Sequence, residues 1–191
     1  ELMSFLPSNP VWLNQVHSNI SEELPTKKKL DCDASFTYKK KIICTVRTAD
    51  CLPILLTNKE GSFVASIHAG WKSLGTGIIE NTIKKIKSSS ELIAWLGPCI
   101  SKSYFEVGQD VYELFVSNEK ISSLAFLPIK DNKYLLSLSQ VAINKLNKLG
   151  VHEITGMNIT DSFCTFKQTN DFYSYRRDGE TGRMATLIWM E

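Results

Sequence analysis

The chain has 191 residues, 43% of them hydrophobic, and a formal net charge of +2. These values suit one globular domain, which we expect over residues 1–191. The near-balanced charge argues against a nucleic-acid-binding surface, because the lysine runs at 27–29 and 39–41 are short and typical of solvated surface. We also expect no membrane segment or signal peptide. Five cysteines at scattered spacing indicate no disulfide framework and favour a cytoplasmic location.

Three β-strands are predicted in the first part of the chain. Residues 41–47 are rich in β-branched side chains, as strands often are. Residues 51–57 and 62–68 are two further apolar runs, and the turn signal Asn-Lys-Glu-Gly at 58–61 separates them. The last two runs therefore predict a β-hairpin whose second strand ends at His68.

Helices are mixed with strands in the rest of the chain. After Gly77, isoleucines recur at helical spacing, and residues 107–116 and 139–149 show the same kind of apolar stripe. Strands are predicted at 92–96 and 184–189. The residues expected to face the core from the three helices are Ile79, Ile83 and Ile86, then Val107, Val111, Leu114 and Phe115, and finally Ala142, Leu146 and Leu149, with Gly150 as the stop. Because strict β-α-β alternation is absent, the pattern predicts an α+β fold with layered sheets and flanking helices.

Three residues suggest a metal site, namely His17, Cys51 and His68. Two imidazoles and one thiolate are three of the four ligands of a tetrahedral zinc, and the open fourth position would admit water or substrate. Their spacing matches neither a zinc finger nor a His-Glu-x-x-His helix nor the nucleobase-deaminase pattern. Each ligand would therefore come from a separate element, and the spacing alone does not establish the site.

Other interpretations of the same residues remain open. Cys51 could be a buried core side chain, or a nucleophile with His68 as its base and no metal. The neighbouring Asp50 could accept the ring N–H of a metal-bound histidine and so orient the ring. It is also the nearest candidate for a general base.

Basic side chains offer possible contacts to an anion. Lys72 lies where a turn leads into a predicted helix, a place that favours phosphate, although a solvated lysine is equally consistent with the pattern. Arg176 and Arg177 lie in a glycine-rich segment and could present planar guanidinium groups to an anionic substrate. The alternative for this pair is a salt-bridged structural turn with Asp178.

Six segments of the chain, in order from Val11 to Met190, resemble the YfiH family, once described as multicopper polyphenol oxidases or laccases. The segments read Trp-Leu-Asn-Gln-Val-His, Thr-Ala-Asp-Cys-Leu-Pro, His-Ala-Gly-Trp-Lys, Trp-Leu-Gly-Pro-Cys-Ile, Phe-Glu-Val-Gly and Tyr-Arg-Arg-Asp-Gly-Glu-Thr-Gly-Arg-Met-Ala. The resemblance implies a mixed α/β layered fold similar to the catalytic domain of cytotoxic necrotizing factor. It also implies that His17, Cys51 and His68 bind a catalytic zinc ion.

The activity implied by the resemblance is zinc-dependent purine nucleoside phosphorylase. Adenosine, inosine and methylthioadenosine would be cleaved by phosphate, with adenosine deaminase as a further activity. On this basis we expect catalytic roles for His17, Cys51, His68 and Asp50. The residues expected to contact the nucleoside or phosphate are Gln15, Arg47, Lys72, Arg176 and Arg177.

The chain departs from the family pattern in three places. Lys72 replaces the usual arginine, and Arg47 stands where a small or apolar residue is more common. We also expect that the family's usual N-terminal segment is missing. Three alternatives stay open, namely a cysteine hydrolase acting on a peptidoglycan precursor, a copper polyphenol oxidase and a non-catalytic, metal-stabilised binding module. The expected partners are small molecules, without nucleic acid or membrane, and the chain could be a monomer or a dimer.

Overall fold

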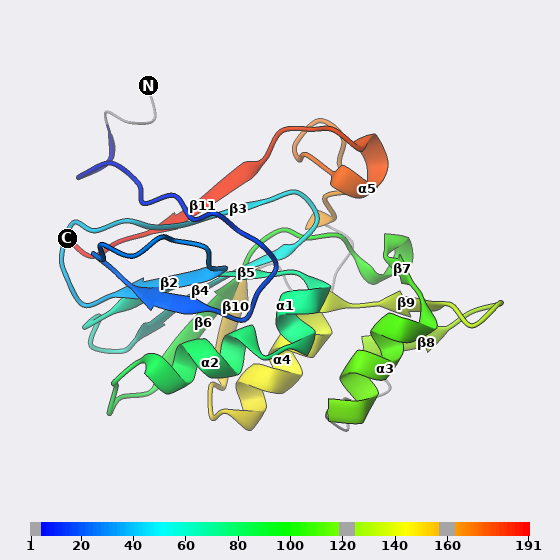
Figure 1. Cartoon of the computed structure of the whole chain (residues 1–191), viewed down its shortest axis with the longest axis horizontal. Coiled ribbons are helices and arrows are strands. Elements are labelled where there is room, and N and C mark those ends of the chain that lie inside the picture. The colour runs from blue at the N-terminus through cyan, green and yellow to red at the C-terminus, as the bar shows by residue number, and fades with distance from the viewer. Residues whose placement is uncertain (1–4, 119–124, 157–162) are drawn as a thin grey trace.

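The computed structural model describes residues 5–118, 125–156 and 163–191. Its centre is a six-stranded mixed sheet (Figure 1). The strands lie side by side in the order β1 (Ser21–Glu23), β2 (Ala34–Thr37), β5 (Val64–Ala69), β4 (Leu52–Asn58), β6 (Leu92–Leu96) and β10 (Glu153–Gly156). The four inner strands pair antiparallel, and β1 and β10 join the edges in parallel.

Different layers cover the two faces of this sheet. The antiparallel pair β3 (Cys44–Thr48) and β11 (Met184–Ile188) packs on one face, and the helices α1 (Trp71–Gly75), α2 (Ile78–Lys85) and α4 (Leu138–Lys148) cover the other (Figure 1). A small antiparallel sheet lies at one end with a further helix. Its elements are β7 (Glu106–Val107), β9 (Tyr134–Leu136), β8 (Phe126–Pro128) and α3 (Gln109–Asn118). Two short helical segments are η2 (Lys102–Tyr104) and α5 (Tyr175–Asp178).

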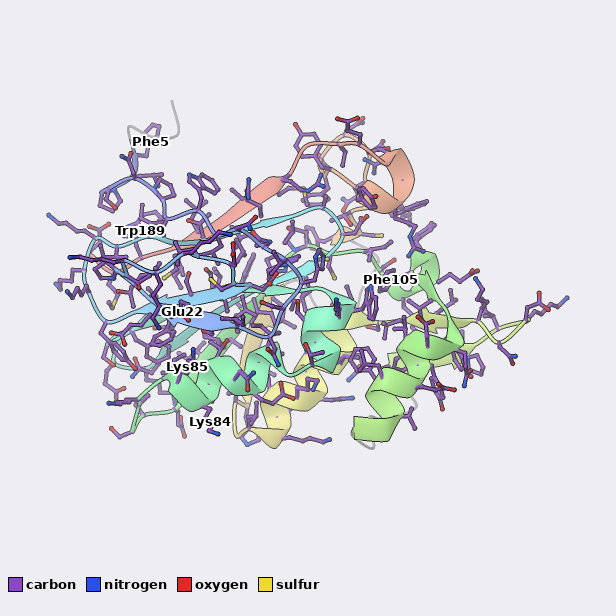
Figure 2. All side chains as sticks on the ribbon, in the orientation of Figure 1. Phe5, Glu22, Lys84, Lys85, Phe105 and Trp189 are labelled. Atoms are coloured by element: carbon purple, nitrogen blue, oxygen red, sulfur yellow. The ribbon has the colours of Figure 1, made fainter. Side chains whose placement is uncertain are left out.

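The central hairpin carries the main core. All six residues of β5 are buried, and so are five of the seven residues of β4, because layers cover both faces of the sheet. Charged side chains extend outward around this core, as Lys84 and Lys85 do from α2 (Figure 2). Lys85 reaches Glu22 on the edge strand at 4.0 Å, which ties the helix to that edge. Among the described residues, none of the helices combines the length and apolar character needed to cross a bilayer.

The predicted α+β class and the β4–β5 hairpin are confirmed, and the strand at 92–96 has the predicted bounds. The strand predicted at 41–47 starts only at Cys44, because Lys41 adopts a left-handed turn with φ 62°. Val107 belongs to β7, so the helix predicted from it begins two residues later. Leu149 is 37% exposed rather than inward-facing, since α4 ends before it and Gly150, at φ 81°, terminates the helix as expected.

Candidate active site

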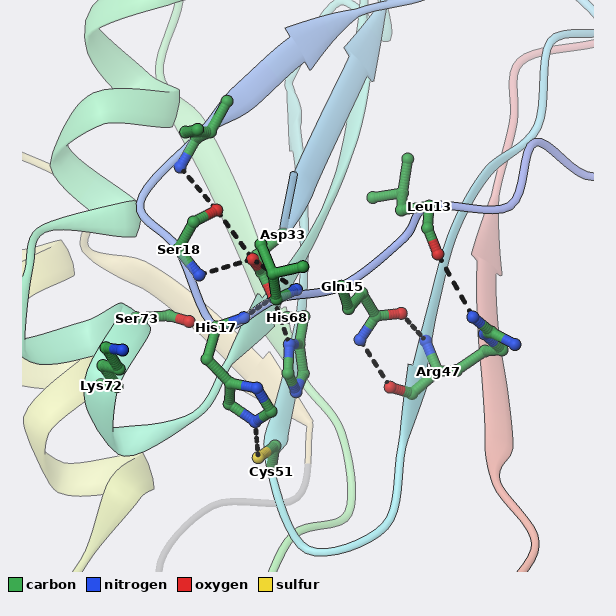
Figure 3. A network of polar contacts seen from close by, with 12 residues as sticks. Leu13, Gln15, His17, Ser18, Asp33, Arg47, Cys51, His68, Lys72 and Ser73 are labelled. Atoms are coloured by element: carbon green, nitrogen blue, oxygen red, sulfur yellow. Dashed lines mark hydrogen bonds and ion pairs between the residues drawn. The ribbon is translucent and has the colours of Figure 1, made fainter. Parts of the chain in front are cut away.

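The structure brings His17, Cys51 and His68 together, although they come from three separate segments (Figure 3). His17 lies in the loop before β1, Cys51 in the turn between β3 and β4, and His68 near the end of β5. The Sγ atom of Cys51 is 3.8 Å from Nε2 of His17, and the two imidazole rings meet edge to face at 4.8 Å. One donor atom from each residue lies within 4.8 Å of the others.

This geometry fits a metal ion. A tetrahedral zinc with ordinary bond lengths places its nitrogen and sulfur ligands about 3.3–3.6 Å apart. The donor atoms would therefore have to approach one another by about 0.2 to 1.5 Å to close the site. The donor set of two imidazoles and one thiolate suits zinc or copper. In the described part of the chain, no other cluster of three potential metal-binding side chains is present.

The backbone at Gly70 packs closely against two of the three candidate metal ligands, Cys51 and His17. Gly70 follows β5, and a Cβ atom built on it would lie 2.9 Å from Sγ of Cys51 and 3.0 Å from Cδ2 of His17. The side chain of any larger residue at this position would therefore clash with Cys51 and His17. The Gly in the His-Ala-Gly-Trp segment is needed for this close approach rather than for a special turn.

The three residues also perturb one another electrostatically. Burial raises the pKa of the Cys51 thiol, but hydrogen bonds with His17 and His68 outweigh this and lower it to about 6. Burial lowers the pKa of His68, while its hydrogen bonds with Asp33 and Cys51 raise it to about 9. Without a metal, the site therefore favours a thiolate beside an imidazolium near neutral pH.

The cluster lies on the floor of a cavity of about 760 Å³. Aromatic side chains of Trp71, Phe105 and Tyr175 line it, and so do three guanidinium groups. Arg47, from β3, donates to the carbonyl oxygen of Leu13 at 3.2 Å, while Arg176 and Arg183 come from the segment around α5. Apolar rings and cations together suit a ligand with a flat base and an anionic part.

Several of the predicted substrate contacts lie in this cavity. Gln15, Arg47 and Arg176 are among its lining residues. Gln15 is held by two hydrogen bonds with the backbone of Arg47, both 2.8 Å long. Arg176 donates to the carbonyl oxygen of Glu106 at 3.0 Å and lies over the ring of Phe105 at 5.1 Å.

The other two predicted anion contacts lie elsewhere. Lys72 is exposed on α1, a helix of five residues, and is not among the residues that line the cavity. The guanidinium of Arg177 donates to the carbonyl oxygens of Thr165, Phe166 and Phe172 and pairs with Asp178. Arg177 thus forms the structural turn that the sequence allowed, and its donors are used within the protein.

Asp50 lines the cavity but does not orient a histidine. Its carboxylate accepts hydrogen bonds from the Thr165 hydroxyl at 2.7 Å and the Arg176 amide at 2.6 Å, so it joins the Cys51 turn to the C-terminal segment. The carboxylate that contacts His68 is Asp33, at 2.7 Å from Nδ1. The sequence analysis does not identify Asp33 as a site residue, because all of its contacts within the site are with residues far away in the chain. The sequence analysis assigned no role to the remaining residues that line the cavity, namely Ala49, Trp71, Ile100, Phe105, Leu138, Tyr175, Thr181 and Arg183.

Known proteins resemble the whole chain. A family described as multi-copper polyphenol oxidoreductase laccase matches residues 1–191. A Haemophilus influenzae protein named purine nucleoside phosphorylase is 45% identical over 97% of this chain and 76% of its own length. Purine nucleoside phosphorylase YfiH of Escherichia coli is 42% identical over 97% of this chain and 75% of its own.

Two solved structures also resemble this chain. A Neisseria meningitidis protein superposes with a TM-score of 0.91 at 40% identity, covering 100% of this chain and 77% of the other. A Bacillus licheniformis protein titled hypothetical protein YfiH gives a TM-score of 0.82 at 25% identity, with 95% and 74% covered. The chain therefore belongs to the YfiH family, whose members are also described as laccase-like multi-copper polyphenol oxidoreductases.

Proposed function

We propose that this protein is a zinc-dependent purine nucleoside phosphorylase. The observation that carries the proposal is the position of His17, Cys51 and His68 on the floor of a cavity with aromatic and arginine walls. The relatives from Haemophilus influenzae and Escherichia coli carry the name of this activity. Zinc is preferred to copper because a thiolate and two imidazoles leave one open coordination position, as in catalytic zinc sites, and zinc needs no redox partner.

The residues of the cavity suit each part of the reaction. The purine would stack against rings such as Trp71 and Phe105, and phosphate would be held by guanidinium groups such as Arg176 and Arg183. A phosphate oxygen then forms a bond to C1′ of the ribose while the bond from C1′ to the purine nitrogen breaks. The base leaves with the bonding electrons and takes up a proton, and ribose 1-phosphate remains.

The metal and the protein residues would have separate roles in the reaction. When bound, zinc supplies Lewis-acid polarisation of an oxygen or nitrogen in the cavity. The protein holds the ligands, positions the phosphate and shields the reacting atoms within the cavity. Asp50 is assigned to positioning the Cys51 turn, because both of its carboxylate oxygens already accept hydrogen bonds from Thr165 and Arg176.

Adenosine, inosine and methylthioadenosine are the proposed substrates, with adenosine deamination as a further activity. In deamination, the oxygen of a water molecule forms a bond to C6 of adenine and ammonia leaves. A direct test is to incubate the protein with inosine, with and without phosphate, and to identify products by chromatography and mass spectrometry. The proposal predicts hypoxanthine and ribose 1-phosphate only with phosphate. Phosphate-independent release of free ribose would contradict it.

A metal-independent cysteine hydrolase is the second candidate, because the Cys51 thiol has a lowered pKa of about 6 and a histidine nitrogen 3.8 Å away. A covalent acyl-enzyme on Cys51, trapped with an acylated substrate and detected by mass spectrometry in metal-free protein, would support this candidate. Its absence, together with phosphate-dependent cleavage of inosine, supports the phosphorylase.

A further inference from the structure

Asp33 lies beneath the metal cluster, directly before β2, and its residue is 0% exposed. A buried carboxylate is costly unless its oxygens are fully hydrogen-bonded. Within the described parts of the chain, Asp33 pairs with no lysine or arginine, and its only ion-pair partner is the buried His68. Its position therefore depends on the groups that donate to it, which are the loop that carries His17 and the ring of His68.

The first set of donors comes from the loop that carries His17. The Oδ1 atom accepts the backbone N–H of His17 at 3.0 Å, and Oδ2 accepts the N–H groups of Val16 and Ser18 at 3.2 and 2.6 Å (Figure 3). The Ser18 hydroxyl adds a fourth bond at 2.8 Å. Three successive N–H groups pointing at one anion form a nest, and His17 adopts a left-handed backbone with φ 57° within it. The carboxylate thus fixes the turn that presents the first histidine.

The second set of contacts holds His68. The Nδ1 atom of its ring lies 2.7 Å from Oδ1 of Asp33, and its backbone N–H donates to the Asp33 carbonyl oxygen at 2.7 Å. A carboxylate at Nδ1 keeps a proton on that nitrogen, which leaves Nε2 as the metal-binding atom. His68 is only 3% exposed, so few other orientations are open to its ring.

We propose that Asp33 is the positioning residue of the metal centre, and that its single carboxylate aligns two of the three ligands at once. This inference rests on the metal site of the proposed function, but not on the reaction catalysed there. Cys51 is held separately through Asp50, so loss of the Asp33 carboxylate would disturb both histidines while leaving the thiolate in place.

The test is Asp33→Asn, which keeps the size of the side chain and removes its charge and two of its acceptor positions. We expect the affinity for zinc, measured by competition with a chromogenic chelator, to fall by about 10- to 100-fold, as for other residues that hold metal ligands in place. Cobalt(II) loaded at saturating concentration should show a changed visible absorption spectrum, because the coordination geometry changes. A residue with a purely structural role would lower the melting temperature and leave the spectrum of the folded, loaded protein unchanged.

Asp31→Asn is the matched control, because it makes the same chemical change two residues away. Asp31 pairs with Asn14 and Lys29 and contacts none of the three ligands in the described structure. It should keep the wild-type affinity and spectrum. If Asp33→Asn folds and also keeps both, the proposal is overturned. If Asp33→Asn does not fold, Asp33→Glu supplies the same readouts with the charge retained but displaced, and an unchanged spectrum there would overturn it equally.

The outcomes separate this proposal from the proposed function. Wild-type protein that binds cobalt through a thiolate but never cleaves inosine would contradict the phosphorylase and leave the role of Asp33 standing. Wild-type protein that binds neither cobalt nor zinc would overturn the metal centre and the role of Asp33 together.

Discussion

The floor and the rim of the cavity are built in opposite ways. The floor, defined as His17, Cys51 and His68, rests on the Asp33 carboxylate. That carboxylate is 0% exposed and bonds to the backbone of His17 and the ring of His68, whereas His17 itself is exposed. The rim, defined as Tyr175, Arg176, Thr181 and Arg183, belongs to a short surface segment. Tyr175 is 61% exposed there, and Arg176 and Arg183 are also exposed. A candidate metal site supported by a buried carboxylate therefore adjoins a solvated, cationic edge.

This difference suggests a division of roles. Groups locked by buried hydrogen bonds keep ligands in place at little entropic cost on binding, whereas exposed side chains adjust to a ligand and are screened by solvent. Changes in the floor should weaken metal binding and turnover together. Changes in the rim should alter the KM for phosphate and leave the metal in place. The predictions below test this division.

The largest effect is expected from Cys51→Ala. Loss of the thiolate removes one of the three proposed protein ligands, so zinc content should fall close to zero. The kcat/KM for inosine should drop more than about 100-fold, beyond the loss typical of residues that only support a ligand. Mass-spectrometric metal analysis and product assays measure both quantities. Cys44→Ala, which removes a buried thiol outside the cluster, should retain zinc.

Gly70→Ala tests whether the floor tolerates displacement. The new methyl group would meet Sγ of Cys51 at 2.9 Å and Cδ2 of His17 at 3.0 Å, so we expect weaker zinc binding and a loss of about 1–3 kcal/mol in the free energy of unfolding. Zinc titration and chemical denaturation give the two values.

Gly61→Ala is the companion variant for Gly70→Ala. Gly61 has open space around it but a φ of 60°, so alanine there should lower stability by about 1 kcal/mol through backbone strain alone. Its zinc affinity should remain at the wild-type value. Equal losses of zinc affinity in both variants would show that the site responds to stability rather than to the close contact at Gly70.

Arg183→Gln tests the rim. The guanidinium lines the cavity and lies over the ring of Tyr175 at 5.9 Å. Removing one charge-assisted contact to phosphate should raise the KM for phosphate about tenfold, with zinc content unchanged. Lys133→Gln, the same charge change at an exposed side chain paired with Glu106, serves as the control for net charge. Loss of zinc from Arg183→Gln would contradict the claim that changes in the rim leave the metal in place.

The last prediction concerns the pH dependence of Cys51 reactivity, which changes no residue of the floor or rim. Burial raises the pKa of Cys51, but hydrogen bonds with His17 and His68 outweigh this and lower it to about 6, whereas burial raises the pKa of Cys44 and Cys99 to about 12. The thiolate is the reactive form and accumulates as pH rises above the pKa. In chelator-treated protein, iodoacetamide should therefore label Cys51 first, with a rate that rises about tenfold per pH unit below 6 and levels off above it. Added zinc should suppress the labelling.

Much of the fold could be predicted from local patterns. The strand at 92–96 and the β4–β5 hairpin follow from apolar runs and a turn signal, and Gly150 marks the end of α4. The edge strands β1 and β10 were missed because Ser21–Glu23 and Glu153–Gly156 are short and polar. Their pairing depends on neighbours far away in the chain, which local propensity does not encode.

The candidate site could be predicted only as far as its motifs extend. His17, Cys51 and His68 stand in distinctive segments, and the structure brings them together. Asp33 has no such marker, because its contacts to the His17 loop and to His68 arise from the arrangement of β2 and β5. Arg177 is the opposite case. Its sequence context predicts a contact to an anionic substrate, but its guanidinium bonds to Thr165 and Asp178 and holds the turn there.

Removal and restoration of the metal test the central claim most directly. The protein is stripped with a strong chelator, dialysed, and assayed for phosphate-dependent release of hypoxanthine from inosine before and after addition of one equivalent of zinc. The account predicts that activity disappears with the metal and returns with zinc in wild-type protein, but not in Cys51→Ala. Undiminished activity in protein shown by mass spectrometry to contain no metal would contradict it.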